Sequence, residues 1–163
     1  TELPDKRAAI LTALQELIGA GVPIDGFGHQ MHIRLSSSIP DALATISAIE
    51  DMYAGLVNQV TELDISVYDD PGTCWESGTD CDADVGDPLP EDLSKRQAQM
   101  YRDFFNGLTT RPSVDSVTLW GISDSDSWLN GSPIDRNNHP QLFDRQSEPK
   151  PAFFALSDPT YEI

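Results

Sequence analysis

The chain has 163 residues, enough for one ordinary domain with its own core, and 39% of them are hydrophobic. Its 27 acidic and 10 basic side chains give a formal net charge of −17, which repels nucleic acid and anionic membranes. No apolar run approaches the roughly 20 residues of a membrane span. The sequence therefore predicts no nucleic-acid and no membrane partner, and it leaves neutral or cationic partners such as a sugar polymer open.

Hydrophobic periodicity predicts helices and strands in alternation over the first part of the chain. A helix is expected over Pro4–Ile18, where apolar residues recur at helical spacing before Gly19. The alternating segment Gly26–Ile33 predicts a buried strand with polar groups at its tip. A second helix is predicted over Pro40–Ala54, with proline in its first turn, and a strand then runs from Val57 through Glu62.

The second part of the chain repeats this alternation around two loops. Residues 69–90 are dense in Asp, Gly and Pro and predict a long loop, followed by a helix over Glu91–Asn106. A third strand is expected over Ser113–Ile122, then a loop-rich segment over 123–148 and a short helix over Pro151–Leu156.

This element order predicts an α/β fold with parallel strands and right-handed crossovers. Three strands alone form a small sheet with two exposed edges, so the order fits a segment of a (β/α)8 TIM barrel better than a complete small domain. We expect residues 1–163 to form one such segment without a second domain. The chain has no initiator Met and opens on Thr1–Asp5, which is not a signal peptide, so we expect it to begin inside a longer precursor.

Carboxylates and a histidine fall at the predicted ends of neighbouring strands. Glu62 and Asp64 close the second strand and share one face, and His32 lies at the end of the first. In a barrel this edge carries the catalytic centre, and an imidazole between two carboxylates would orient Glu62 and hold its charge. Any one of these residues alone is better explained as a loop cap or a satisfied core histidine. The occurrence of all three at the ends of adjacent strands favours a catalytic site.

Two tryptophans in the third strand and its loop, Trp120 and Trp128, are candidate platforms for sugar rings. Core packing is the ordinary explanation for a tryptophan taken singly. Gln30 and Asp124 are further polar residues expected at strand ends.

Cys74 and Cys81 lie close together in the acidic loop. A zinc site would need four ligands, which this loop does not offer, so two free thiols or a local disulfide are the alternatives. We favour the disulfide, which predicts an oxidising, secreted setting.

The same loop contains a spacing typical of calcium loops. Asp80, Asp82 and Asp84 alternate, and Glu91 is the twelfth residue counted from Asp80. Position six is Val85 rather than glycine, and two prolines interrupt the frame, so a solvated acidic loop is the favoured interpretation. We expect no bound metal and no cofactor.

Taken together, these segments resemble the C-terminal half of the family 10 glycoside hydrolases, the endo-1,4-β-xylanases. They occur in the family's order and cover nearly the whole chain. The matching segments are Gly21–Gly28, Gln30–His32, Thr61–Asp64, Val117–Gly121 with Asp124 and Ser127–Trp128, Leu142–Asp144, and Pro149–Phe153.

The resemblance implies the sixth to eighth barrel strands and a site. Glu62 resembles the nucleophile, His32 the histidine that binds it, and Asp64 the carboxylate that holds this histidine. Gln30, Trp120 and Trp128 resemble sugar-contacting positions. His29 stands where the family usually has an apolar residue, and the loop bearing Cys74 and Cys81 looks enlarged.

The resemblance also implies a second catalytic carboxyl, the acid/base, in an Asn-Glu pair that this sequence lacks. We therefore expect the chain to supply part of an extracellular retaining endo-xylanase acting on xylan, with the N-terminal half of the barrel as its partner. A barrel β-1,4-glucanase and a non-catalytic carbohydrate-binding fragment are the alternatives.

Overall fold

Proline marks the start of the α-helices in the computed structural model, which describes residues 3–163. Proline lies in the first turn of three helices and at the N-cap of two others, where its missing N–H and fixed φ are tolerated. The helices are α1 (Pro4–Gly19), α2 (Ile39–Met52), α3 (Gly72–Ser77), α4 (Glu91–Thr109) and α5 (Pro151–Ser157).

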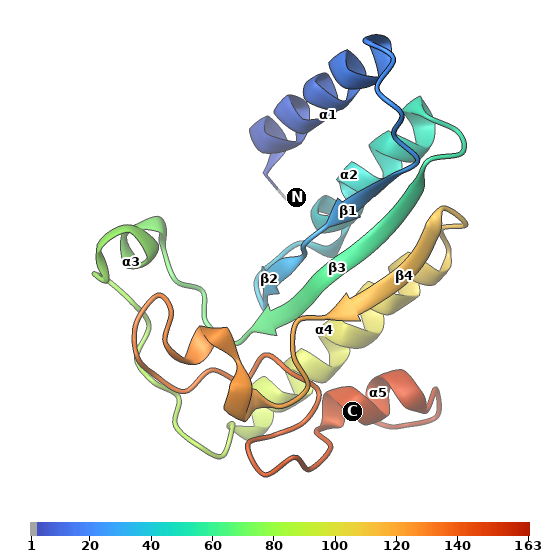
Figure 1. Ribbon diagram of the computed structural model, residues 1–163. Helices are drawn as coiled ribbons and strands as arrows, with labels where there is room; N and C mark the ends of the chain where they lie inside the picture. Colours follow the sequence, from blue (N-terminus) through green and yellow to red (C-terminus); the bar gives the residue numbers. More distant parts are fainter. Residues whose placement is uncertain (1–2) are drawn as a thin grey trace.

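The strands form a parallel sheet around the long central strand β3 (Val57–Ser66). Two short strands, β1 (Gly26–His29) and β2 (His32–Arg34), pair in succession along one side of β3, and β4 (Val114–Leu119) pairs along the other. Figure 1 shows the helices between successive strands, as the alternating element order predicted. The segment after β4 contains two short 3-10 helices, η1 (Asp124–Asp126) and η2 (Trp128–Asn130).

The prediction of one continuous strand over Gly26–Ile33 is wrong. Gln30 and Met31 separate β1 from β2, and Met31 adopts a left-handed conformation with φ of 65°. A buried, unbranched side chain rarely takes this conformation, so the surrounding structure must hold it there. Glu62 N–H donates to the carbonyl of Gln30 at 3.0 Å, which ties the interruption to β3.

Other element predictions need smaller corrections. The segment 69–90 was expected to be loop throughout, but residues Gly72–Ser77 form α3. The second helix ends at Met52 rather than Ala54, and Met52 is exposed although it is apolar. Helix periodicity identifies a stripe but does not say how far neighbouring elements extend over it.

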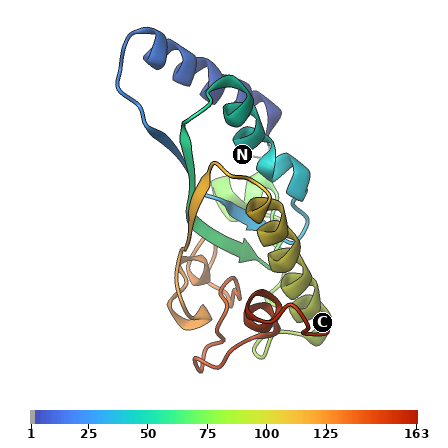
Figure 2. The ribbon, with the colours of Figure 1, turned by 90° about the vertical axis from the view of Figure 1, so that its right-hand side faces the viewer.

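The core lies between the sheet and the helices that cover one of its faces. In Figure 2 the strands run along one side of the molecule, with α2, α4 and α5 along the other. β3 contributes Val60, Leu63 and Ile65 to this core, and α4 contributes Tyr101 and Phe104, all fully buried. Among the described residues, β1, β2 and β4 have β3 as their only strand partner, so both edges of the sheet are open.

None of the helices described between residues 3 and 163 combines the length and the apolar character needed to cross a membrane.

Candidate active site

Glu62 lies at a β-bulge in β3. Val60 pairs with Val117 and Leu63 with Leu119, so between these two pairs β3 contains one residue more than β4. Side chains alternate along a strand, and alternation from the buried Val60 would direct Glu62 toward the helices. The extra residue shifts the alternation, so Leu63 enters the core while Glu62 and Asp64 meet the same imidazole outside it.

His32 joins the two carboxylates. Its Nε2 lies 3.1 Å from Glu62 Oε2, and its Nδ1 lies 3.0 Å from Asp64 Oδ1. The pairing of β2 with β3 places His32 beside Asp64 in register, so the backbone fixes where the ring stands. The fully buried Asp64 also accepts a hydrogen bond from Trp128 Nε1 at 2.8 Å. The sequence predicted that these three residues would meet, and they do.

The electrostatics favour a charged imidazole. The hydrogen bond to Asp64 is the largest cause that raises the pKa of His32 above its usual 6.5, and Glu62 adds to it, while partial burial opposes both. A protonated His32 donates from both nitrogens and therefore stabilises both carboxylates in their ionised form. Such an arrangement can hold Glu62 as a charged, oriented nucleophile.

Aromatic rings surround this imidazole. The ring centroids of Trp128 and Trp120 lie 5.2 and 6.3 Å from that of His32, both in edge-on geometry. The two indoles are 40% and 47% exposed, so they do not fill the core. Gln30, exposed, is two residues before His32, and its carbonyl holds Glu62 N–H. Glu62, His32, Asp64, Trp120 and Trp128 therefore gather in one group, which Gln30 joins through its backbone carbonyl.

Comparison with known proteins explains the arrangement. The family model of glycosyl hydrolase family 10 matches residues 1–159. The chain belongs to this family.

The thermostable celloxylanase of Thermoclostridium stercorarium is 41% identical over 162 residues, which are 98% of this chain and 39% of that protein. An endo-1,4-β-xylanase of Geobacillus stearothermophilus is 37% identical over 157 residues, 94% of this chain and 44% of that protein. The crystal structure of xylanase B from Clostridium stercorarium F9 matches with a TM-score of 0.85 at 39% identity, covering 98% of this chain and 44% of that one.

The family 10 chain thus spans about two fifths of the length of the curated relatives that it matches. This confirms the predicted fold class, a C-terminal portion of a (β/α)8 barrel, and it accounts for the two open sheet edges. In a closed barrel every strand has two neighbours, so both edges are places where further strands would pair.

The segment that carries Trp128 is fixed by a buried ion cluster. Lys150 Nζ donates to Asp124 Oδ2 at 3.0 Å and to the carbonyls of His139 and Gln141, each at 2.8 Å. Asp124 Oδ1 accepts from Gln141 N–H at 2.8 Å, and Asn130, just after Trp128, donates to Asp124 O. Asp124 was expected at the strand tip as a polar site residue. It is instead fully buried, and its role in this family 10 chain is to position the loop.

Gly121 lets this loop leave β4 directly after Trp120. Its φ is +135°, and a Cβ there would come within 2.9 Å of Gln141 Nε2. The same amide donates to the carbonyl of Trp120 at 2.9 Å, so the glycine allows the contact that holds this residue.

The loop between β3 and α4 contains a disulfide and a third tryptophan. Cys74 and Cys81 are bonded with an S–S distance of 2.02 Å, across seven positions of the chain. Trp75, next to the buried Cys74, packs with its ring centroid 6.0 Å from that of Trp128. Sequence reasoning missed Trp75 because it lies in a segment without periodicity. The only signal was its position beside a cysteine.

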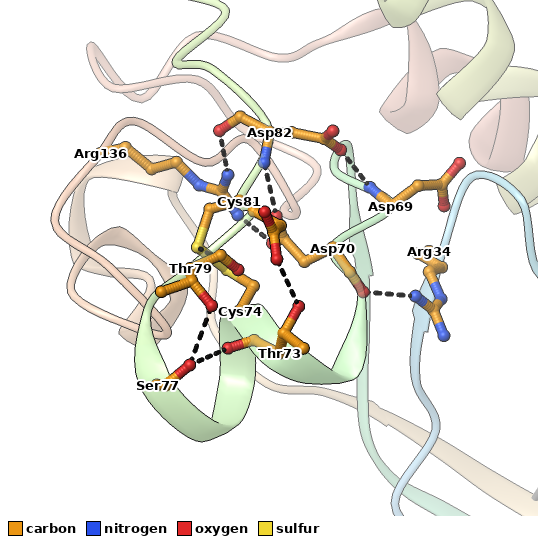
Figure 3. Close-up of a disulfide and its surroundings, with 11 residues drawn as sticks. Arg34, Asp69, Asp70, Thr73, Cys74, Ser77, Thr79, Cys81, Asp82 and Arg136 are labelled. Atoms are coloured by element: carbon orange, nitrogen blue, oxygen red, sulfur yellow. Dashed lines mark hydrogen bonds and ion pairs between the residues drawn. A yellow bond between two sulfur atoms is a disulfide. The ribbon is translucent and has the colours of Figure 1, made fainter.

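A second ion pair ties this loop to the segment after β4. Arg136 donates to the buried Asp70 carboxylate and stands over the Tyr68 ring, with its guanidinium carbon 3.6 Å from the ring centroid. Asp70 O in turn accepts from Arg34 at 2.9 Å (Figure 3). The loop is therefore attached to both neighbouring segments of the site.

The calcium-loop alternative is not supported by this geometry. Asp80 accepts from Thr73, Asp82 from the backbone of Asp69, and Asp84 from the backbone of Gly86. Within residues 3–163, the only group of three or more His, Cys, Asp or Glu ligand atoms within 4.8 Å of one another contains Asp70 and the two cysteines of the disulfide. The acidic residues of the loop thus bind its own backbone and side chains.

His29 at the end of β1 is buried. Its Nε2 lies 2.8 Å from Asn58 Oδ1, and burial lowers its pKa below 6.5. The hydrogen bond to Asn58 satisfies this buried polar ring, so the fold accommodates a histidine here.

Proposed function

We propose that this chain supplies the nucleophile of a retaining endo-1,4-β-xylanase that hydrolyses internal bonds of xylan. The observation that carries the proposal is His32 between Glu62 and Asp64, in a chain of family 10 whose relatives bear the names of xylanases. A neutral, hydrated polymer suits a surface with a net charge of −17 and exposed indoles at its site.

Glu62 attacks the anomeric carbon and forms a covalent glycosyl-enzyme, while the bond to the leaving oxygen breaks. His32 holds Oε2, so we assign the attack to Oε1. An acid/base carboxyl from the N-terminal half protonates the leaving oxygen, then takes a proton from the water that releases the sugar. The two carboxyls should lie about 5–5.5 Å apart, as double displacement requires.

Asp64 and His32 act through Glu62 and are positioning residues. Asp64 keeps His32 charged and oriented, because its carboxylate accepts from one ring nitrogen and is itself fixed by Trp128. Trp120 and Trp128 offer exposed faces on which the C–H faces of sugar rings stack. Gln30, an exposed residue between β1 and β2, is the remaining candidate for a sugar contact.

The test uses the completed barrel, meaning this chain together with the segment that supplies the other strands. Glu62→Ala should abolish hydrolysis of xylan, whereas Glu148→Ala, a change at an exposed carboxylate, should leave it unchanged. Added azide should restore cleavage in Glu62→Ala by attacking the anomeric carbon, giving a glycosyl azide of inverted configuration. Near-normal turnover of Glu62→Ala without azide would refute the assignment.

A β-1,4-glucan is the second candidate substrate, because one relative is named a celloxylanase and another, from Acetivibrio thermocellus, an exoglucanase. Rates on xylo-oligosaccharides and cello-oligosaccharides of equal length decide between them. We expect xylan to be preferred, and a higher kcat/KM on the cellulose series would reverse the order.

We also propose that the protein works outside the cell. The disulfide between Cys74 and Cys81 supports this location, since such bonds persist in oxidising compartments. Native protein in the culture medium with both cysteines blocked to thiol reagents is the expected result. Detection only inside cells, with two free thiols, would contradict it.

A further inference from the structure

Aromatic rings form a continuous row across the site and beyond it. The row runs from Trp120 to His32, from His32 to Trp128 and from Trp128 to Trp75, with centroid separations of 6.3, 5.2 and 6.0 Å. Trp75, at its far end, is 49% exposed, the largest fraction among the three tryptophans. An indole that is half exposed and packs against a second part-exposed indole is not explained by core packing.

The loop around Trp75 is built to hold this ring in place. Cys74 is almost fully buried and bonded to Cys81, so the residue directly before Trp75 is fixed from two sides. Thr73 donates to Asp80. Ser77 hydrogen bonds with Thr79, which closes the turn of α3 on itself (Figure 3). The helix is only six residues long and could not persist alone, so these bonds are what present the indole.

A pocket of about 200 Å³ lies between this loop and the carboxylate site, and Trp75, Trp128, His32 and Asp64 are among its walls. It is smaller than the roughly 300–1,000 Å³ that encloses a drug-sized ligand, and it suits one ring-sized group. Besides the two indoles, its walls contain Ser66, Tyr68, Arg34 and Asp70, so apolar and polar surfaces lie side by side, as a sugar ring requires.

We propose that Trp75 binds a sugar unit of the polymer main chain, one place further from the bond that is cut than the units at Trp120 and Trp128. The disulfide between Cys74 and Cys81 is what keeps this subsite formed. The inference rests on the proposed function, and it adds that the enzyme discriminates substrates by length through this loop.

The experiment measures kcat/KM of the completed barrel on xylo-oligosaccharides of three to six units. Trp75→Ala should lose about tenfold on the oligosaccharides that reach the loop and less than about twofold on the shortest, because one stacking contact is lost only where a sugar occupies it. Trp75→Phe should recover most of the loss. Phe154→Ala, at an exposed aromatic residue of α5, should be neutral at every length.

The double variant Cys74→Ser with Cys81→Ser keeps Trp75 but frees its loop. It should show the same length dependence as Trp75→Ala with a smaller loss. A loss that is equal at all lengths, or no loss in Trp75→Ala, would overturn the subsite. A length dependence in Trp75→Ala with none in the cysteine variant would overturn the role of the disulfide.

The outcome is separable from that of the proposed function. If the wild-type barrel cleaves no xylo-oligosaccharide, the proposed function fails. The Kd for xylohexaose, measured by calorimetry, then still tests the subsite, because wild type should bind about tenfold more tightly than Trp75→Ala. Equal binding by the two proteins would overturn the subsite in that case too.

Discussion

Helices α1 and α4 are both apolar along one face, but only α4 is covered. Of the 16 residues of α1 only Leu14 is buried, and Leu17, from the same apolar stripe, is 48% exposed. α4 buries six of its 19 residues between the sheet, α2 and α5. It also holds the segment after β4, because Tyr101 donates to the carbonyl of Pro140 at 2.6 Å.

The difference shows which part of a partial barrel stands on its own. α4 lies between β3 and β4, and both strands are in this chain, so its apolar stripe meets a complete surface. α1 precedes β1, whose second edge is open among the described residues, so its stripe meets only half a surface. A sequence pattern tells which face of a helix seeks burial, whereas cover depends on the neighbours that are present.

The largest loss of stability should come from removing a charge of the buried ion cluster of Asp124 and Lys150. Asp124→Ala leaves the Lys150 ammonium buried without its carboxylate, and burial already lowers the pKa of Lys150. We expect a loss of about 3–5 kcal/mol in the free energy of unfolding, measured with urea. Asp126→Ala, at an exposed carboxylate of the same 3-10 helix, should stay within about 0.5 kcal/mol. Equal losses in both variants would show that the cluster is unimportant.

The short helix α3 differs from both α1 and α4, because a disulfide rather than an apolar face attaches it to the rest of the chain. Replacing both Cys74 and Cys81 with serine should lower the free energy of unfolding by about 2.5 kcal/mol, from the loop-closure entropy of so short a loop. Urea unfolding of the oxidised wild type and the double variant gives the value. An unchanged midpoint would mean that hydrogen bonds alone fix the loop.

Hydrogen exchange sharpens the comparison directly. Backbone amides of α1 should exchange at least about tenfold faster than those in the middle of α4, because few buried contacts oppose the opening of α1. Completing the barrel should slow α1 and leave α4 nearly unchanged. Equal protection of the two helices in the isolated chain would refute the contrast.

The smallest effect concerns two histidines of one segment, one on each face of the sheet. The pKa of His32 is raised by Asp64 and Glu62, so its stabilising contribution is full below about 6.5 and is lost as the pH rises through the raised value. The pKa of His29 is lowered by burial. NMR titration should therefore show His32 titrating above His29. Asp64→Asn should bring His32 back toward 6.5, and a reversed order would contradict the site geometry.

Much of this fold could be predicted because its elements carry local signals. Proline at helix starts, apolar spacing and the alternation of helix with strand predicted four of the helices, β3, β4 and the parallel order, but not the division of the first strand into β1 and β2. The meeting of His32, Glu62 and Asp64 followed from their place at neighbouring strand ends.

The features that were missed depend on contacts between distant segments. Met31 takes its left-handed conformation because β3 holds the backbone on both sides, and the sequence has no glycine there to announce it. The ion cluster joins Asp124 to Lys150, 26 positions apart, and each residue alone looks like an ordinary surface charge. Trp75 meets Trp128 from a loop that a disulfide closes, 53 positions earlier in the chain.

The bulge in β3 has a consequence for the ways in which this strand can pair. Because one additional residue sets which face Glu62 occupies, the strand behaves like a reading frame for side chains. If the same residues alternated without the bulge from Val60 onward, the sequence would be unchanged, and yet Glu62 and Asp64 would face the core while Leu63 faced away from it. The strand therefore has two registers for one sequence, and only the bulged register brings both carboxylates to His32.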